Sequence, residues 1–438
     1  MKWIICVLLF LLKRFSLNGI VTHKRLKIQL IAPDEAGFRQ YVGDLIATHR
    51  STAKVTTHLS QKMDSGAVPT FEFLDPIFFS PIRTRLDAKM LADRVMSESP
   101  DLVHIHHEYG FWGSKTPSKY QFPCFVAEVR AYSQEVRITA TAHTVIDQGF
   151  SYPVKGRGIQ APFRAAANTF LLPFLKAYWS KWSWGILDGV TAHSKTQLPS
   201  LRKSGCKITK SIPHYIPHPL RPHLPNPNSK QILVFGYFTP EKGQDLIIEA
   251  LKYTKTNVNL ILAGGLRRNE DQLFYDHCKM LISNHPKKEK ITVTGYLNFN
   301  ELDKICDESA LAVLPFRATS GSGSLADLFT RSMPVLASDL TLNQEINDRI
   351  PNSLALFKSE SPESCANSID KLIENPEEIK VLSQNAERYA QEFGPEPIAQ
   401  MFETFFHEVL NQNSTYRVSD RPEKTPNIPS NPIEGSKL

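Results

Sequence analysis

Short apolar runs alternate with amphipathic segments along most of this 438-residue chain. In the front half, the pattern predicts strands at residues 26–33, 54–58, 71–74, 102–106, 138–142 and 189–191, and helices at 38–49 and 87–97. Strands that are separated by helices form parallel sheets with both faces covered. Functional residues of such sheets are expected in the loops at the carboxyl ends of the strands.

A proline-rich stretch at residues 212–230, IPHYIPHPLRPHLPNPNSK, interrupts this pattern and has the composition of a stiff linker. A second alternating series follows it. Strands are predicted at 231–235, 257–262, 291–294, 311–315, from 334 and at 354–357, and helices at 244–251, 271–284, 300–308, from 325, and at 362–375, 376–392 and 395–412. The predicted fold is α/β, with two Rossmann-like doubly wound domains facing a cleft.

The chain is therefore expected to divide into consecutive parts with different roles. These are an apolar and basic leader (1–24), a front Rossmann-like domain (25–216), a proline-rich linker (217–230), a second Rossmann-like domain (231–394), a C-terminal helix (395–412) and a disordered tail (413–438). The ten-residue apolar run in the leader is too short to span a bilayer. We interpret the leader as an interfacial anchor or as a segment dispensable to the fold.

Charge is distributed unevenly along the sequence. Residues 1–230 carry 30 Lys and Arg against 15 Asp and Glu, whereas residues 231–412 carry 17 against 26. The basic front half is expected to meet something anionic, such as a membrane surface, unless the surplus lysines only solvate the surface. The six cysteines contain no CxxC pair, which is typical of reduced thiols in a cytoplasmic chain.

An aromatic and basic segment, FRAAANTFLLPFLKAYWSKWSW at residues 163–184, has two interpretations. It could be a helix on a membrane surface. It could also be a core helix with a few lysines at its edge, which is the commoner place for an aromatic stripe.

The loop at residues 318–324 has a composition suited to binding an anion. It holds two glycines and four hydroxyl residues directly before a predicted helix. Backbone N–H groups in such a loop, together with the positive end of the helix dipole, could cradle a phosphate. A plain connecting loop has the same composition, so the loop alone does not decide.

Several motifs together resemble the GT-B type glycosyltransferases of the retaining family 4, or group 1. In the back half these are VFGYFTPEKGQDLIIEAL (234–251), LILAGG (260–265), VTGYLNFNELDKICDESALAVLPF (293–316) and MPVLASD (333–339). In the front half, PDLVHIHHEYG, TATAHT and DGVTAHS are similar to family segments. The resemblance covers about residues 25–412.

The resemblance implies a donor site in the back half. Lys242 matches the family lysine that holds the donor diphosphate, while the arginine usual after Gly236 is replaced by Tyr237. The glycine Gly37 would let backbone approach the diphosphate closely. The remaining donor-binding candidates are Gly236, Gly264, Tyr296, Gly321, Gly323 and Asp327.

The family's two glutamates, which have seven residues between them, fall on Thr319 and Asp327. Asp327 keeps a carboxylate for the ribose, but Thr319 keeps none for the sugar, so Ser320 or Ser322 is the candidate replacement. His143 matches the histidine that reaches the transferring sugar and could share its developing charge. His107 and Glu108 are candidates for binding the acceptor.

The sequence thus predicts a glycosyltransferase, retaining by resemblance, that uses a UDP- or GDP-sugar and a glycan or lipid-linked acceptor in surface polysaccharide or glycolipid assembly. No metal or other cofactor is required by the sequence, and no motif indicates nucleic acid. The alternatives are a nucleotide-sugar epimerase or hydrolase and a catalytically silent scaffold or binding protein.

Overall fold

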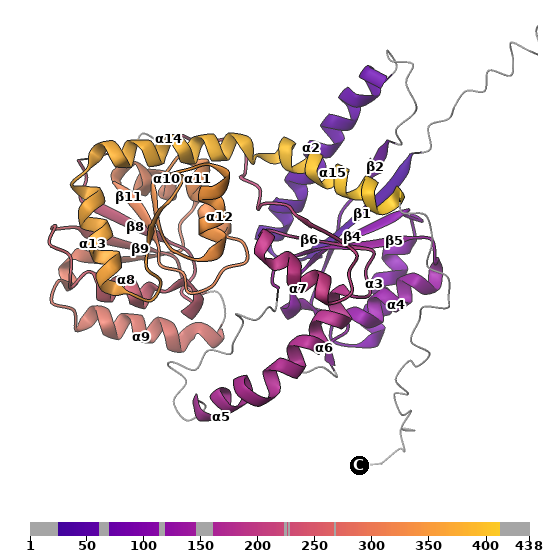
Figure 1. Cartoon of the computed structure of the whole chain (residues 1–438), viewed down its shortest axis with the longest axis horizontal. Helices are drawn as coiled ribbons and strands as arrows, with labels where there is room; N and C mark the ends of the chain where they lie inside the picture. Colours follow the sequence, from indigo (N-terminus) through magenta and orange to yellow (C-terminus); the bar gives the residue numbers. More distant parts are fainter. Residues whose placement is uncertain are drawn as a thin grey trace, which may run out of the picture.

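The computed structural model describes residues 25–411, apart from 61–69, 114–118, 146–160, 223–225, 227 and 267–268. These residues form two parallel sheets with helices packed around each, one in the front half of the chain and one in the back half (Figure 1). The predicted leader and tail lie outside the described residues.

The first sheet has the strand order β2-β1-β4-β5-β6-β7, and β3 pairs with the later part of β1. Every pairing is parallel. The carboxyl ends of its central strands therefore meet at one edge, where His107 at the end of β4 pairs with Ala142 at the end of β5. The strands are β1 (Leu26–Pro33), β2 (Phe71–Phe73), β3 (Ile77–Phe79), β4 (Leu102–His107), β5 (Arg137–Ala142), β6 (Gly189–Ala192) and β7 (Ile208–Ser211).

One helix of the first half, α2 (Ala36–Ser60), is longer than the helix that the sequence predicted. The helices of this half are α2, α3 (Arg85–Met96), α4 (Phe122–Tyr132), α5 (Ala161–Ala166), α6 (Leu172–Trp184) and α7 (Leu198–Lys203). The strand predicted at 54–58 is wrong, because α2 continues through these residues. Its Val and Thr residues favour a strand by propensity, but β1 already pairs with β2, β3 and β4, and tertiary context overrides propensity.

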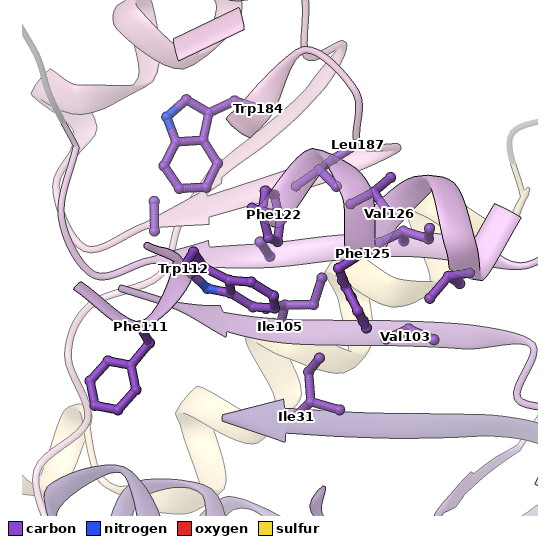
Figure 2. Close-up of a cluster of buried hydrophobic side chains, with 14 of the residues drawn as sticks. Ile31, Val103, Ile105, Phe111, Trp112, Phe122, Phe125, Val126, Trp184 and Leu187 are labelled. Atoms are coloured by element: carbon purple, nitrogen blue, oxygen red, sulfur yellow. The ribbon is translucent and has the colours of Figure 1, made fainter. Parts of the chain in front are cut away.

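One face of this sheet packs on α3, α4 and α6 through a core rich in aromatic rings (Figure 2). Trp112 and Phe122 lie at its centre with their rings 4.9 Å apart in a steep crossing, and neither side chain is exposed. Large rings bury much apolar area, so this core stabilises the strands β4 and β5 that pack on it.

The second sheet has the order β10-β9-β8-β11-β12-β13, again with every strand parallel. Its strands are β8 (Gln231–Phe235), β9 (Asn259–Ala263), β10 (Ile291–Gly295), β11 (Leu311–Leu314), β12 (Val335–Ser338) and β13 (Ala355–Phe357). Its helices are α8 (Gln244–Ala250), α9 (Gln272–Ser283), α10 (Phe299–Glu308), α11 (Gly323–Thr330), α12 (Thr341–Arg349), α13 (Pro362–Ile373) and α14 (Pro376–Glu392). The strand order reverses beside β8, which is where ligands bind in such sheets.

The last helix returns to the first half of the chain. α14 lies along the second sheet, and α15 (Pro395–Asn411) crosses to α2 and the first sheet (Figure 1). Ile398, Phe402 and Phe406 are buried there beside Ile28 of β1. The C-terminal helix thus completes the core of the front half.

The aromatic segment at 163–184 forms a bent rod of α5, a π-helical turn (Ala167–Leu171) and α6. The core interpretation holds for one face only: Leu172, Trp179 and Trp184 are buried, whereas Phe163 and Phe174 are exposed. Among the described residues, no helix combines the length and apolar character needed to cross a membrane.

Candidate functional site

The loop between β11 and α11 reaches across to the first half of the chain. The hydroxyl of Ser320 donates a hydrogen bond to the backbone carbonyl of His143, which follows β5. The next residue, Gly321, packs against the ring of His193, which follows β6. The predicted loop and the predicted strand-end histidine are therefore brought together.

Three histidines at this edge form one chain of hydrogen bonds. The Nδ1 atom of His193 lies 3.1 Å from the carbonyl oxygen of Ile212, and its Nε2 atom lies 3.3 Å from Nδ1 of His143. The Nε2 atom of His143 lies 3.1 Å from Nδ1 of His106. Because a carbonyl can only accept, each neutral ring in the chain must carry its proton on Nδ1.

These imidazoles are neutral at physiological pH. Burial lowers the pKa of His106 and of His193 to about 3, and the neighbouring rings contribute to the lowering. Burial, followed by His193 and His106, also lowers the pKa of His143 well below its usual value. The hydrogen bond from His143 to a sugar that the sequence predicted would require one of its two ring contacts to break.

A carboxylate from the second half binds the start of a helix in the first half. Glu345 on α12 accepts a hydrogen bond from the Ser194 hydroxyl and from the backbone N–H groups of Lys195 and Thr196, at 2.9 and 3.0 Å for the two backbone groups. A carboxylate at a helix N-terminus satisfies otherwise unpaired donors. Arg349, one turn further along α12, donates to Glu345 and to the carbonyl of His193.

Between these contacts the two halves leave a cavity of about 30 Å³. It has room for water but not for a sugar nucleotide. The cavity is lined by His193, His214, Ile216, Gly321, Ser322, Leu325, Ala326, Phe329, Leu342, Ile346, Arg349 and Tyr389.

The PEKG turn that carries Lys242 is held firmly against β11. The left-handed backbone of Gly243 lies so close to the carbonyl of Pro315 that a Cβ atom there would be 2.0 Å from that oxygen. Arg317 donates to the Pro240 carbonyl at 2.9 Å and binds Asp245 through two hydrogen bonds. The turn is thus fixed from both sides.

The Lys242 ammonium lies over the ring of Phe316, which follows β11. Its Nζ atom lies 3.7 Å from the centre of the Phe316 ring, and its charge helps burial to lower the pKa of His214. The rings of His214 and His193 are tilted against each other, with their centroids 5.3 Å apart. Lys242 therefore faces the same cluster as the loop of Ser320.

At the carboxyl ends of β8 and β9 in the second sheet, the backbones of Gly236 and Gly264 lie in close contact. A Cβ atom on Gly264 would lie 2.0 Å from the carbonyl of Gly236, and one on Gly236 would lie 2.9 Å from the Ser324 hydroxyl. Beside this contact, the exposed rings of Tyr237 and Tyr296 meet edge to face at 6.0 Å. The arrangement leaves aromatic surface at the edge where a nucleotide base could stack.

The serine and aspartate candidates around α11 have different surroundings. Ser322 is the N-cap of α11, because its hydroxyl accepts from the backbone N–H of Leu325 at 3.1 Å, and it is buried. Thr319 donates to the carbonyl of Gly321. Burial raises the pKa of Asp327 to about 6, against the opposing effect of Arg331.

Of the candidate residues in the front half, Gly37 and Glu108 lie at the edge of the sheet, whereas His107 lies in the core. Gly37 lies exposed in the first turn of α2, and the ring of its neighbour Phe38 meets His143 at 4.8 Å. Glu108 accepts from the Thr144 hydroxyl at 2.8 Å at the strand edge. The acceptor-binding role predicted for His107 is not supported, because its ring is fully buried among the aromatic core.

Sequence reasoning missed His193 and Glu345. The tripeptide Thr-Ala-His occurs twice, at 141–143 and at 191–193, and Ala142 pairs with Ala192 on adjacent strands. That repeat could have placed His193 beside His143. Nothing local marked Glu345, because its partners lie about 150 positions earlier in the chain.

Comparison with known structures identifies the class of protein. Anabaena HepE in complex with UDP superposes with a TM-score of 0.59 at 15% identity, over 87% of this chain and 100% of that chain. Sucrose-phosphate synthase from Thermosynechococcus elongatus superposes with a TM-score of 0.61 at 15% identity, over 88% and 99%. The chain has the GT-B architecture of two facing Rossmann-like sheets.

Sequence comparison finds a family similarity in the back half. Residues 220–389 match the glycosyl transferases group 1. An uncharacterized glycosyltransferase of Methanocaldococcus jannaschii is 28% identical over 162 residues, which are 37% of this chain and 43% of that relative. Residues 220–389 are thus similar to the group 1 glycosyl transferases, the family that the motifs resemble.

Proposed function

We propose that this protein transfers a sugar from a nucleotide diphosphate donor, of the UDP- or GDP-sugar type, to a glycan or lipid-linked acceptor. The observation that carries the proposal is that the Ser320 loop, within the segment that matches the group 1 glycosyl transferases, contacts the strand-end histidines of the front half, while the charge of Lys242 from the same segment acts on His214 beside them. The HepE structures that resemble this chain contain UDP and UDP-glucose, which favours a uridine donor here.

The donor is proposed to lie at the carboxyl edge of the second sheet. Lys242 would neutralise its diphosphate, and the N–H groups of Gly321 and Gly323 would supply further contacts at the start of α11. Gly236 and Gly264 would let the nucleotide approach backbone closely, beside the ring of Tyr296. Asp327 is proposed for the ribose.

The acceptor is proposed to enter from the first half, beside Glu108 and Gly37. We infer a role in surface polysaccharide or glycolipid assembly, since neighbouring folds include a lipopolysaccharide galactosyltransferase. A cytoplasmic site of action is consistent with the described cysteines, which are all free.

The experiment that tests this function is a thermal-shift screen of the whole chain against UDP, GDP, ADP, CMP and their sugar conjugates. Stabilisation by one nucleotide series is the expected result. Sugar release from that conjugate is then measured with and without candidate acceptors. Product without acceptor would indicate an epimerase or hydrolase instead.

A silent scaffold is the second candidate, because Thr319 stands where the family has a carboxylate. The Thr319 hydroxyl is already used within its own loop, in the bond to Gly321. A protein that shows no stabilisation by any of these nucleotides would support this second candidate.

A further inference from the structure

The rod formed by α5 and α6 carries an exposed aromatic face. Phe170, Phe174 and Tyr178 follow one another at intervals of four residues, and their side chains are 74%, 75% and 38% exposed. Lys181 is exposed one turn further on. At this spacing the four side chains lie on one side of the helix, and we call them the aromatic face.

The opposite side of the same helix is packed against the front-half core. Leu172 and Trp179 are buried there, with exposed fractions of 4% or less. A helix that is apolar on both sides is normally buried on both sides. The aromatic face is therefore a surface built for a partner.

The charge of this segment favours one kind of partner. Residues 161–187 contain three Lys and Arg and no Asp or Glu, within a front half that has 15 more basic than acidic residues. Helices with Phe, Tyr and Trp beside Lys bind the interface of bilayers that contain anionic lipids. A symmetric contact between two copies would bring Lys181 close to a second basic segment without carboxylates.

The position of the rod relates it to the cleft. The chain leaves β5 beside His143 and returns through α5 and α6 to the start of β6, which is parallel to β5. The α5 end of the rod therefore lies nearer the cleft, and Figure 1 shows it on the side of the second sheet. A bilayer on this face would lie beside the entrance for an acceptor.

We propose that the aromatic face docks the protein on an anionic lipid bilayer. The binding itself does not depend on the transferase assignment. Its consequence does rest on the proposed function: a docked enzyme would take its acceptor from the bilayer, so the acceptor is expected to be lipid-linked rather than a free glycan.

The test is flotation of the whole chain with phosphatidylcholine vesicles, with and without phosphatidylglycerol. Binding is expected only to the anionic vesicles, and it should weaken as salt is raised. The double variant Phe170→Ser/Phe174→Ser should lose about tenfold in bound fraction. Lys181→Glu should also weaken binding to the anionic vesicles, because it replaces a basic side chain on the aromatic face with an acidic one.

The matched control is Leu86→Ser/Met90→Ser, which removes two exposed apolar side chains from α3 of the same half. All variants are also made in a chain that starts at residue 25, because the leader could bind lipid by itself and every described element lies after it. Wild-type binding in the control, and loss in the aromatic variant in both backgrounds, is the expected result.

Three outcomes would overturn the proposal. They are equal loss in the α3 control, no binding by the chain that starts at residue 25, and a wild-type dimer that the aromatic variant converts to a monomer. Nucleotide-dependent thermal stabilisation should persist in the aromatic variant. Its persistence separates failure of docking from failure of the donor site.

Discussion

A Cβ atom on Gly321 would lie 2.7 Å from the Cδ2 atom of the His193 ring, although the two residues belong to different halves of the chain. The adjacent Ser320 hydroxyl binds the carbonyl of His143. The loop that contains Thr319, where the family has its sugar-binding glutamate, thus contacts the chain of hydrogen-bonded histidines directly. Contact between the two halves and formation of the candidate site are one event.

Gly321→Ala is expected to loosen this contact. Both the ring and the loop are held by neighbours, so the added methyl should cost about 1–3 kcal/mol in the closed arrangement. Small-angle scattering should show a larger radius of gyration than for the wild type, and the thermal midpoint should fall.

Gly323→Ala is the matched control, because nothing lies within 4 Å of a Cβ atom there. It lies two residues away, at the first position of α11. Its stability should be unchanged or raised by about 0.5–1 kcal/mol, since alanine favours the helix. Equal effects of the two substitutions would contradict the close approach to His193.

Glu345→Ala is expected to destabilise the contact from the other side. The carboxylate accepts from Ser194, Lys195 and Thr196, and its removal leaves the buried Ser194 hydroxyl, two partly buried backbone donors and Arg349 without this partner. The expected loss is about 2–4 kcal/mol in the free energy of unfolding, measured by urea denaturation.

The control for this substitution is Glu249→Ala, which removes one partner of an exposed ion pair with Lys252. Its effect should stay below about 1 kcal/mol. A Glu345→Ala variant as stable as this control would show that the contact between the halves contributes little in solution.

Lys242→Ala is expected to weaken donor binding by about tenfold or more, through loss of a charge beside the diphosphate. The effect should be largest for nucleotide diphosphates and small for the monophosphates, as measured by calorimetry. Lys252→Ala, which changes an exposed lysine of the same half, should bind the donor as the wild type does. Equal affinity of the Lys242 variant and the wild type would refute the diphosphate role.

The back half was predicted closely because its strands are continuous apolar runs between turn residues. The predicted strand at 231–235 coincides with β8, and that at 291–294 falls one residue short of β10. The inner strands β11 and β12 are buried at every residue, so burial and local pattern agree there. The front half was predicted less well, since the residues at 54–58 favour a strand locally and become helix through context.

The candidate site was predicted in part for the same reason. Lys242 and the 318–324 loop belong to short motifs whose spacing is fixed by a strand and a turn. His107 and His106 alternate on one strand, and only the fold decides that His107 faces the core while His106 joins the histidine chain. Contacts between the halves, such as that of Glu345, leave no local pattern.

Asp327→Asn is expected to make the protein more stable at neutral pH while weakening donor binding. Burial raises the pKa of this carboxyl to about 6, above its value in the unfolded chain. The folded state therefore binds the proton more tightly, so this carboxyl's contribution to stability is present at low pH and is lost as the pH rises through about 6.

The amide in the variant cannot ionise, so the gain from the substitution should grow from near zero below pH 4 to about 3 kcal/mol above pH 7. If the ionised carboxylate binds the ribose, wild-type donor affinity should fall as the pH is lowered through about 6, and that dependence should vanish in Asp327→Asn. Urea denaturation and calorimetry across this range measure both quantities. A stability difference that does not vary with pH would show that Asp327 is not buried as the structure has it.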